Sequence, residues 1–308
     1  MRAFLFPGQG SQAVGMGAAL CEASRGAKDV FAEVDEALGQ NLFRLMRDGP
    51  DEDLRLTENA QPAIMANSLA VFRTLGLPLP DVAQFVAGHS LGEYSALCAA
   101  GTFDLATTAK LLKLRGQAMQ QAVPVGLGAM AALLGADLEL AQKIAAAAAE
   151  GQVCEVANDN DPSQVVISGH KTAIDRAIEL AKEMGAKRAV PLPVSAPFHC
   201  SLMEPAADAM SDALSYEVLE APSVPLFANV TAEPTDDPDA IRSQLVSQVT
   251  GMVRWRESVA NMAAVGVDEF VEIGGKVLGS MVRRIAPEAK VTSVATIEDV
   301  EALAKEIA

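Results

Sequence analysis

The chain alternates short apolar runs with longer segments whose apolar positions recur at helical spacing. Strands are expected at residues 3–6, 85–87, 226–230 and 269–273. Helices are expected at residues 30–38, 63–75 and 202–214. An alternation of this kind is typical of a parallel sheet with helices on its faces. The pattern therefore predicts an α/β fold.

Residues 128–194 show a different order of predicted strands and helices. Four β-prone runs and two helical segments occur there in the order βαββαβ, which is the order of a split ferredoxin-like unit. The runs are AMAALLG, QVCEVAN, QVVISG and KRAVPLPV, and the helices are expected at 138–150 and 172–185. We therefore expect a small domain at 125–196, inserted into a larger domain made of 1–124 and 197–308.

Composition limits the partners and the compartment. A net charge of −16 argues against a broad nucleic-acid or anionic-membrane surface, because phosphate binding needs clustered Lys and Arg. No apolar stretch approaches the ~18 residues of a spanning helix, and the N-terminal apolar run is too short for a signal peptide. The four cysteines stand far apart, without metal-type spacing. We expect a cytoplasmic protein with reduced cysteines and no metal.

The segment Gly88-His89-Ser90-Leu91-Gly92 fits the pattern G-x-S-x-G. In that pattern the glycines permit a tight turn from strand to helix that exposes the serine hydroxyl. The strand expected before it and the helical stretch after it suit a nucleophile. The alternative is a glycine-rich turn whose serine only caps the helix.

A serine nucleophile needs a base, and the chain has three histidines. His89 adjoins Ser90, so its side chain should leave the turn in another direction, and His170 is expected in a surface loop of the small domain. His199 lies where the chain re-enters the large domain and is the best candidate, although it could instead be a packed histidine at the junction. Cys200 is a weaker alternative nucleophile.

Arg115 falls on the apolar side of a helical stretch, because it is three residues after Leu112 and four before Met119. A guanidinium that faces inward needs an anion. That anion is either a carboxylate of the protein or the carboxylate of a substrate, which Arg can hold with two parallel hydrogen bonds.

Acyl transfer also needs donors for a developing oxyanion. The N–H of Leu91, at the start of a helix, is one candidate. A second could come from the glycine-rich loop at residues 6–12, FPGQGSQ, which follows the first strand. This loop matches neither G-x-G-x-x-G nor the P-loop, which are the two patterns of phosphate-binding loops. The alternative is therefore a plain tight turn.

Taken together, these motifs resemble the malonyl-CoA:acyl carrier protein transacylases and the acyltransferase domains of polyketide synthases. The shared segments occur in the family's order along nearly the whole chain. They are FPGQGSQ, TENAQPA, GHSLGEYSAL, LRGQAMQ with Arg115, Asn158 with QVVISG, PFHC, NVTA and VRW. The resemblance implies an α/β-hydrolase-like core with a ferredoxin-like insertion.

By this resemblance Ser90 is acylated, His199 is its base, and Leu91 N–H with Gln9 forms the oxyanion hole. Arg115 would hold the malonyl carboxylate. The remaining implied roles belong to two further residues: Phe198 would exclude a 2-methyl group, and Gln248 would lie near the carbonyls that orient the histidine. Asp159 and Asp161 remain candidates for a third triad member.

The family resemblance implies a ping-pong transfer of malonyl from malonyl-CoA to the pantetheine thiol of acyl carrier protein, without a cofactor. Three alternatives stay open: a serine thioesterase or esterase, a trans-acting acyltransferase of a polyketide pathway, and a noncatalytic acyl-binding module. Gly251-Met252 replaces the Asn-Pro common among relatives, which predicts a more mobile loop around Gln248.

Acyl carrier proteins are acidic, so a carrier should dock on a local basic patch. Two clusters of basic residues qualify, and either could instead be a solvated face. The first is Lys276, Arg283, Arg284 and Lys290, and the second is Lys182, Lys187 and Arg188.

Overall fold

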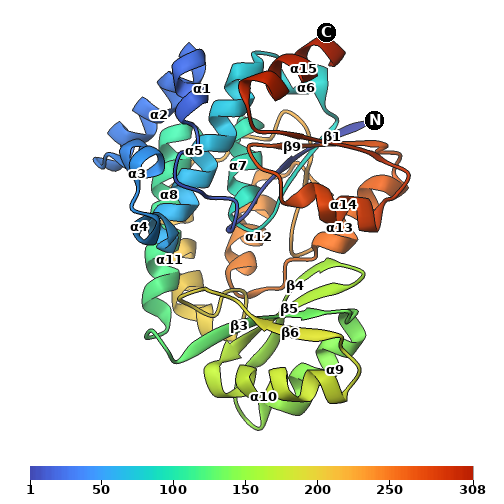
Figure 1. Cartoon of the computed structure of the whole chain (residues 1–308). Coiled ribbons are helices and arrows are strands. Elements are labelled where there is room, and N and C mark those ends of the chain that lie inside the picture. The colour runs from blue at the N-terminus through green and yellow to red at the C-terminus, as the bar shows by residue number, and fades with distance from the viewer. Residues whose placement is uncertain (308) are drawn as a thin grey trace.

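The computed structural model describes residues 1–307 and contains two separate sheets, one in each part of the molecule (Figure 1). The strands of the first are β1 (Arg2–Phe6), β2 (Phe85–Gly88), β7 (Leu226–Phe227), β8 (Pro234–Thr235), β9 (Glu269–Ile273) and β10 (Lys290–Val294). Their order is β10-β9-β1-β2-β7-β8, and all neighbours are parallel except β7 and β8. The prediction of a mixed α/β fold with a parallel sheet is confirmed.

The strand expected at 226–230 is shorter in the structure and ends at Phe227. The backbone groups that would extend the strand have other partners: the Asn229 N–H donates to Glu93 Oε2 at 2.9 Å, and the Asn229 oxygen accepts from the Arg254 N–H at 2.9 Å. The Asn229 side chain contacts the neighbouring turn, where its Nδ2 donates to the Gly88 carbonyl at 2.7 Å and its Oδ1 accepts from the Ser90 N–H at 2.8 Å.

The second sheet is antiparallel and lies in the lower part of Figure 1. Its strands are β3 (Gly128–Leu134), β4 (Cys154–Asp161), β5 (Gln164–His170) and β6 (Arg188–Pro191). They stand in the order β4-β5-β3-β6. Two helices, α9 (Leu138–Ala149) and α10 (Lys171–Glu183), cover the face turned away from the first sheet. The elements follow one another as the sequence pattern predicts.

The first sheet is accompanied by the remaining helices. They are α1 (Ala18–Ala23), α2 (Arg25–Leu38), α3 (Leu42–Asp48), α4 (Asp51–Arg55), α5 (Thr57–Leu75), α6 (Leu79–Val82), α7 (Leu91–Ala99), α8 (Leu105–Ala122), a 3₁₀ turn η1 (Ser201–Met203), α11 (Glu204–Ser215), α12 (Pro238–Thr250), α13 (Trp255–Ala264), α14 (Leu278–Ile285) and α15 (Ile297–Ile307). Two helices start earlier than their apolar spacing suggests. Ser24 caps α2 by accepting the Ala27 N–H, and α5 runs through Pro62.

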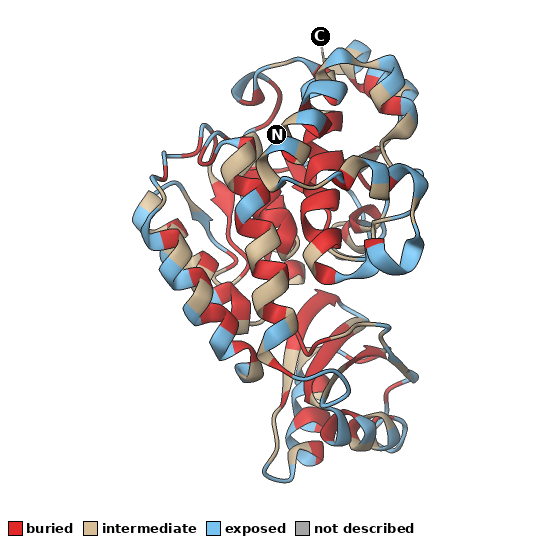
Figure 2. Cartoon of the chain, turned by 90° about the vertical axis from the view of Figure 1, so that its left-hand side faces the viewer, coloured by how far each residue is buried: buried red, intermediate tan, exposed pale blue. Residues whose placement is uncertain are grey.

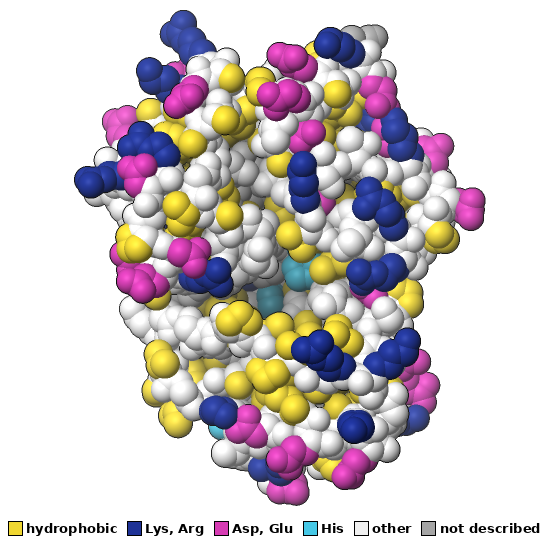
Figure 3. All heavy atoms as spheres, viewed as in Figure 1, with side chains coloured by type: hydrophobic (Ala, Val, Ile, Leu, Met, Phe, Trp, Pro, Cys, Tyr) yellow, Lys and Arg dark blue, Asp and Glu magenta, His cyan; other side chains and the backbone are white. Residues whose placement is uncertain are grey.

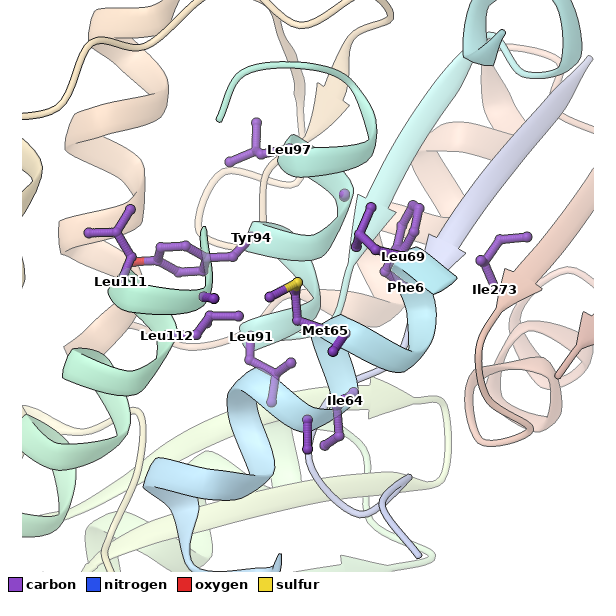
Figure 4. Close-up of a cluster of buried hydrophobic side chains, with 14 of the residues drawn as sticks. Phe6, Ile64, Met65, Leu69, Leu91, Tyr94, Leu97, Leu111, Leu112 and Ile273 are labelled. Carbon is purple, nitrogen blue, oxygen red and sulfur yellow. The ribbon is translucent and has the colours of Figure 1, made fainter. Parts of the chain in front are cut away.

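Helix α7 lies inside the largest hydrophobic cluster. Figure 2 shows that burial is concentrated in the middle of the molecule, and Figure 4 shows α7 between α5 and α8. Leu91 and Tyr94 of α7 pack in this cluster with Met65 of α5 and Leu112 of α8. Because close-packed interiors yield little, this cluster holds the start of α7 in place.

The two sheets are tied together at the end of β4. Asp159, 1% exposed, pairs with Arg256 of α13 at 2.8 Å, and the fully buried Asp161 pairs with Arg284 of α14. Asn158 also forms an isolated bridge with Val253. The small sheet is therefore held against α13, α14 and the segment before α13 by two ion pairs and one backbone bridge.

Two further expectations concern cysteines and membranes. Cys154 and Cys200 are buried, Cys21 and Cys98 are half-buried, and all four are free thiols. None of the helices in the described part of the chain combines the length and the apolarity needed to cross a bilayer.

Candidate active site

Ser90 occupies a sharp turn between β2 and α7. Its φ is +54°, in the left-handed region that side-chain-bearing residues seldom adopt. A Cβ on Gly88 would lie 1.9 Å from the Gly92 carbonyl, and a Cβ on Gly92 would lie 2.2 Å from the Phe6 oxygen. Glycine is thus required at both positions for the turn to pack against β1, which is the physical basis of the G-x-S-x-G pattern.

His199 contacts the serine. Ser90 Oγ and His199 Nε2 are 2.7 Å apart, and His199 Nδ1 is 2.8 Å from the main-chain oxygen of Gln248. A carbonyl only accepts, so Nδ1 carries the proton and Nε2 is left to accept from the serine hydroxyl. His199 is itself at φ +57°. Backbone strain at two facing residues is typical of functional sites.

The electrostatic setting keeps this histidine neutral. Burial, reinforced by the positive charge of Arg115, lowers the pKa of His199 to about 3. The ring is therefore unprotonated at neutral pH and is free to take a proton from Ser90.

Arg115, on α8, is 1% exposed. Its Nη1 donates to Gln61 Oε1 at 2.8 Å, and its Nη2 donates to Gln248 Oε1 at 2.8 Å and to Ser90 Oγ at 3.1 Å. Within residues 1–307 no carboxylate lies at ion-pair distance from it, and its Nε finds no partner. Its hydrogen bonds therefore go to neutral groups, although it lies within reach of the Glu93 charge.

A cavity of about 400 Å³ opens onto Ser90. Gln9, Leu91, Arg115, Phe198 and His199 line it, so it gathers most of the side chains singled out in the sequence. The Leu91 N–H is the first of α7, where no intrahelical acceptor exists. Figure 3 shows histidine atoms at the bottom of a hollow between the two parts of the molecule, with Lys and Arg side chains around it.

The other candidate bases lie away from the hydroxyl. His89 Nε2 contacts Asn160 Oδ1 at 2.9 Å, and His170 Nδ1 accepts the Val153 N–H at 2.9 Å. Both aspartates proposed as a third triad member, Asp159 and Asp161, form ion pairs with arginines of the large part. A carbonyl, and no acid, contacts the second nitrogen of His199.

Cys200 is unsuited to be the nucleophile. Burial raises the pKa of its thiol to about 11, and Sγ donates to the Pro197 oxygen at 3.2 Å. Since the thiolate is the reactive form of cysteine, Cys200 is unreactive at neutral pH.

Gln248 was expected in a loop, and the structure places it in a helix. Gln248 lies in the last turn of helix α12 and is fully buried. Gly251 ends that helix, its N–H bonded to the Ser247 oxygen at 2.9 Å. Gln248 is therefore held in a helix end, next to Gly251-Met252.

Sequence reasoning missed four residues that hold the site together: Gln61, Glu93, Asn160 and Asn229. Each is buried and bonds to a residue singled out from the sequence. The available signal was their place in shared segments: Gln61 in TENAQPA, Glu93 in GHSLGEYSAL and Asn229 in NVTA.

Comparison with known proteins gives consistent results. The family model described as acyl transferase domain matches residues 3–297. A malonyl CoA-acyl carrier protein transacylase of Escherichia coli K12 is 47% identical over 284 residues, which is 92% of each chain. A solved acyl-carrier-protein-S-malonyltransferase of Bartonella henselae is 52% identical, with a TM-score of 0.97 over 99% of both chains.

One further solved structure contains a partner. It is a type II PKS acyl-carrier protein in complex with its malonyl-transacylase, 40% identical to this chain, with a TM-score of 0.96 over 99% of both chains. Matches of this length and identity, over the same residues that form the cavity, lead to one conclusion: the chain belongs to the acyl transferase family.

Proposed function

We propose that the chain transfers the malonyl group of malonyl-CoA to the phosphopantetheine thiol of acyl carrier protein, and so supplies fatty-acid synthesis. The observation that carries this proposal is the contact of Ser90 Oγ with both His199 and Arg115. A nucleophile, its base and a buried cation for a carboxylate meet at one oxygen. The relatives named as malonyl transferases support it.

In the first half-reaction His199 Nε2 takes the proton of Ser90 Oγ while that oxygen attacks the thioester carbon. The N–H of Leu91, together with Gln9, stabilises the oxyanion of the tetrahedral intermediate. The C–S bond then breaks, and His199 returns the proton to the sulfur of coenzyme A. Malonyl remains as an ester of Ser90.

In the second half-reaction the carrier thiol enters the vacated space. His199 takes its proton, the sulfur attacks the ester carbon, and the C–O bond to Ser90 breaks. The proton then returns to Ser90. The same base serves both half-reactions, and the malonyl ester of Ser90 links them, which makes the mechanism ping-pong.

Arg115 and Phe198 set the selectivity in this proposal. Arg115 would exchange its bonds to Ser90 and a glutamine for two bonds to the malonyl carboxylate. The Phe198 ring, 7% exposed, lines the same cavity and would exclude a 2-methyl group. One methyl group discriminates by only about 1–3 kcal/mol, so this selectivity is partial.

A second candidate is transfer to the carrier protein of a polyketide pathway. The complex of a malonyl-transacylase with a type II PKS carrier protein favours it. The two candidates share every chemical step and differ in the carrier, so rates with two purified carriers separate them. A thioesterase would pass the malonyl group to water instead.

We also propose the finer architecture that the sequence suggests. Residues 1–124 and 197–308 would form an α/β-hydrolase-like core, and 125–196 a ferredoxin-like insertion. The parallel strands support the first, and the order β4-β5-β3-β6 supports the second. A cytoplasmic location stays a prediction.

The proposal is tested by intact-protein mass after brief mixing with malonyl-CoA, followed by a chase with carrier protein. We expect a malonyl adduct on the native chain, none on Ser90→Ala, and transfer of the adduct to the carrier. An adduct that clears into water at the same rate without carrier would indicate a hydrolase. Complete absence of an adduct would indicate a binding module.

A further inference from the structure

Glu93 is a buried acid that the mechanism above does not use. It lies on α7, three residues after Ser90, and is fully buried. Its Oε2 accepts the N–H of Asn229 at 2.9 Å and the Nε2 of Gln248 at 3.0 Å. Its Oε1 finds no hydrogen-bond partner among residues 1–307. A buried carboxylate with half its acceptors unused is costly to keep, so its position calls for an explanation.

Asn229, the first of the two residues that donate to Glu93, also contacts the nucleophile Ser90. The Asn229 side chain accepts the Ser90 N–H at 2.8 Å, and its own N–H is the one held by Glu93. Asn229 also donates to the Gly88 carbonyl. Asn229 thus links the carboxylate to the strained turn that presents Ser90.

Gln248, the second residue that donates to Glu93, contacts the base His199 and the cation Arg115. The main-chain oxygen of Gln248 accepts from His199 at 2.8 Å, and its side-chain Oε1 accepts from Arg115 at 2.8 Å. Its Nε2 donates to Glu93 and to the Ser90 carbonyl at 3.0 Å each. One glutamine therefore touches the nucleophile, the base and the cation.

The orientation of the Gln248 amide follows from Glu93. A carboxylate can only accept, so it faces the amide NH₂, and the amide oxygen then faces Arg115, which can only donate. Hydrogen bonds to an ionised acceptor are roughly twice as strong as those to a neutral one. Protonation of Glu93 would therefore loosen the bonds that fix Gln248.

We propose that Glu93 is a positioning residue: its charged carboxylate fixes Gln248 and Asn229, and its protonation weakens the reactivity of Ser90. The proposal rests on the proposed transfer through Ser90 and adds to it a control of the same site by pH. Glu93 acts through its two neighbours and does not itself contact the reacting atoms.

The surroundings of Glu93 bring the pKa of its carboxyl group close to neutral pH. Burial raises its pKa to about 7, although the Asn229 N–H, Gln248 and the charge of Arg115 each act to lower it. The carboxylate form thus prevails above about pH 7 and the neutral form below it.

Few other ionisable groups face this acid. Tyr94, beside it on α7, has its own pKa raised to about 12 by burial and stays neutral. Strand β2 carries no ionisable side chain, and Arg2 of β1 pairs with Glu269. The charged residues of α5 are engaged elsewhere, Glu58 with Lys113 and Arg73 with Glu33. Arg115 is the charge from α8.

A rate that falls as the pH decreases through neutrality is usually explained by protonation of a histidine base, and this explanation does not suit His199. His199 has a pKa of about 3, so it remains an unprotonated base across the neutral range. A loss of Ser90 reactivity between about pH 8 and 6 that is absent from a Glu93→Gln variant is therefore assigned to Glu93 and not to the general base.

The test measures the single-turnover rate of Ser90 acylation by saturating malonyl-CoA between about pH 6 and 8.5. The native chain should react faster as the pH rises through about 7. Glu93→Gln keeps an acceptor oxygen without the charge, so it should react at the native low-pH rate at every pH. Glu93→Ala leaves the buried donors of Asn229 and Gln248 unpaired, at a cost of about 1–3 kcal/mol for such a group, so it should react roughly 5- to 150-fold more slowly than the native chain. Ser95→Ala, equally buried on α7, should match the native chain.

A Glu93→Gln variant with the native pH profile would overturn the proposal, as would a Glu93→Ala variant with the native rate. If the alanine variant does not fold, the glutamine variant carries the test alone. The same variants are also treated with a fluorophosphonate, which labels a reactive serine without a malonyl group. Labelling with the expected pH pattern but no malonylation would reject the malonyl function and keep the role of Glu93.

Discussion

At the residue scale, the site is a set of neutral acceptors arranged around one buried cation. Arg115 donates to two glutamines and to Ser90, and no carboxylate of the described chain pairs with it. A guanidinium with only neutral partners can exchange some of them for an anion at little cost. This is the property that a malonyl-binding residue needs, and an internal ion pair would have prevented it.

Replacing Arg115 should separate malonyl from acetyl transfer. Arg115→Ala removes the cation proposed to pair with the substrate carboxylate. A charged hydrogen bond of about 1.5–3 kcal/mol corresponds to a roughly 10- to 150-fold loss of malonyl transfer. Acetyl transfer should fall less or rise. The measurement is kcat/KM for both acyl-CoA substrates, and an equal loss for both would show that Arg115 is only structural.

How much of the site was predictable differs from residue to residue. Ser90, His199 and Arg115 lie in distinctive local patterns, and the structure brings all three to one oxygen. The supports Asn229 and Gln61 could not be placed in this way. They lie in the shared segments NVTA and TENAQPA, but an amide side chain does not indicate a chemical role as a serine, a histidine or an inward-facing arginine does, and their contacts with Ser90 and Arg115 are known only from the structure.

At the scale of elements, the junction of β1, β2 and α7 decides where Ser90 points. Gly92 lets α7 approach the end of β1 so closely that a Cβ at this position would lie 2.2 Å from the Phe6 oxygen. Helix α7 is in turn packed between α5 and α8 (Figure 4). The sequence predicted this strand-turn-helix unit because all its signals are local. The sequence pattern predicted too long a strand at β7, where Asn229 contacts the turn at Ser90. It did not predict β8, which has two residues, or β10, which is half-exposed, and both are edge strands.

Gly92→Ala should damage both stability and activity. The added methyl would lie 2.2 Å from the Phe6 oxygen, so α7 or β1 must move, and overpacking of this kind costs about 1–3 kcal/mol. We expect a lower midpoint of thermal unfolding and a slower acylation of Ser90.

Gly26→Ala is the matched control for this change. Gly26 lies in the first turn of α2, where a Cβ would make only ordinary contact with Arg73. Alanine favours helix by up to about 1 kcal/mol over glycine, so stability should be unchanged or higher. Equal destabilisation by both variants would contradict the steric argument at Gly92.

At the scale of the whole molecule, an acidic protein carries basic side chains around its hollow (Figure 3). The two basic clusters considered from the sequence partly merge. Lys187 from one and Lys276 with Arg284 from the other line a single groove between the two sheets. Lys276 and Arg284 have carboxylate partners, Asp299 and Asp161, whereas Lys187 has none within 4.0 Å in the described chain.

Charge reversal in this groove should weaken carrier docking without changing the first half-reaction. Lys187→Glu should raise KM for carrier protein by about 2- to 5-fold at low salt, and less at high salt. The rate of malonyl-adduct formation should not change. Lys182→Glu, a surface change on α10 outside the groove, is the control. The idea of a docking groove fails if both variants change KM equally.

The tie between the two sheets has a consequence for recombining this protein with its relatives. The tip of β4 contacts Arg256 and Arg284, and Asn160 within it bonds to His89, the residue beside Ser90. Replacing the small sheet alone would remove the carboxylate partners of Arg256 and Arg284, and it would also remove the contact of Asn160 with His89 beside the serine turn. A chimera that keeps these contacts must therefore exchange β4 together with both arginines, so the unit that can be exchanged intact is larger than residues 125–196.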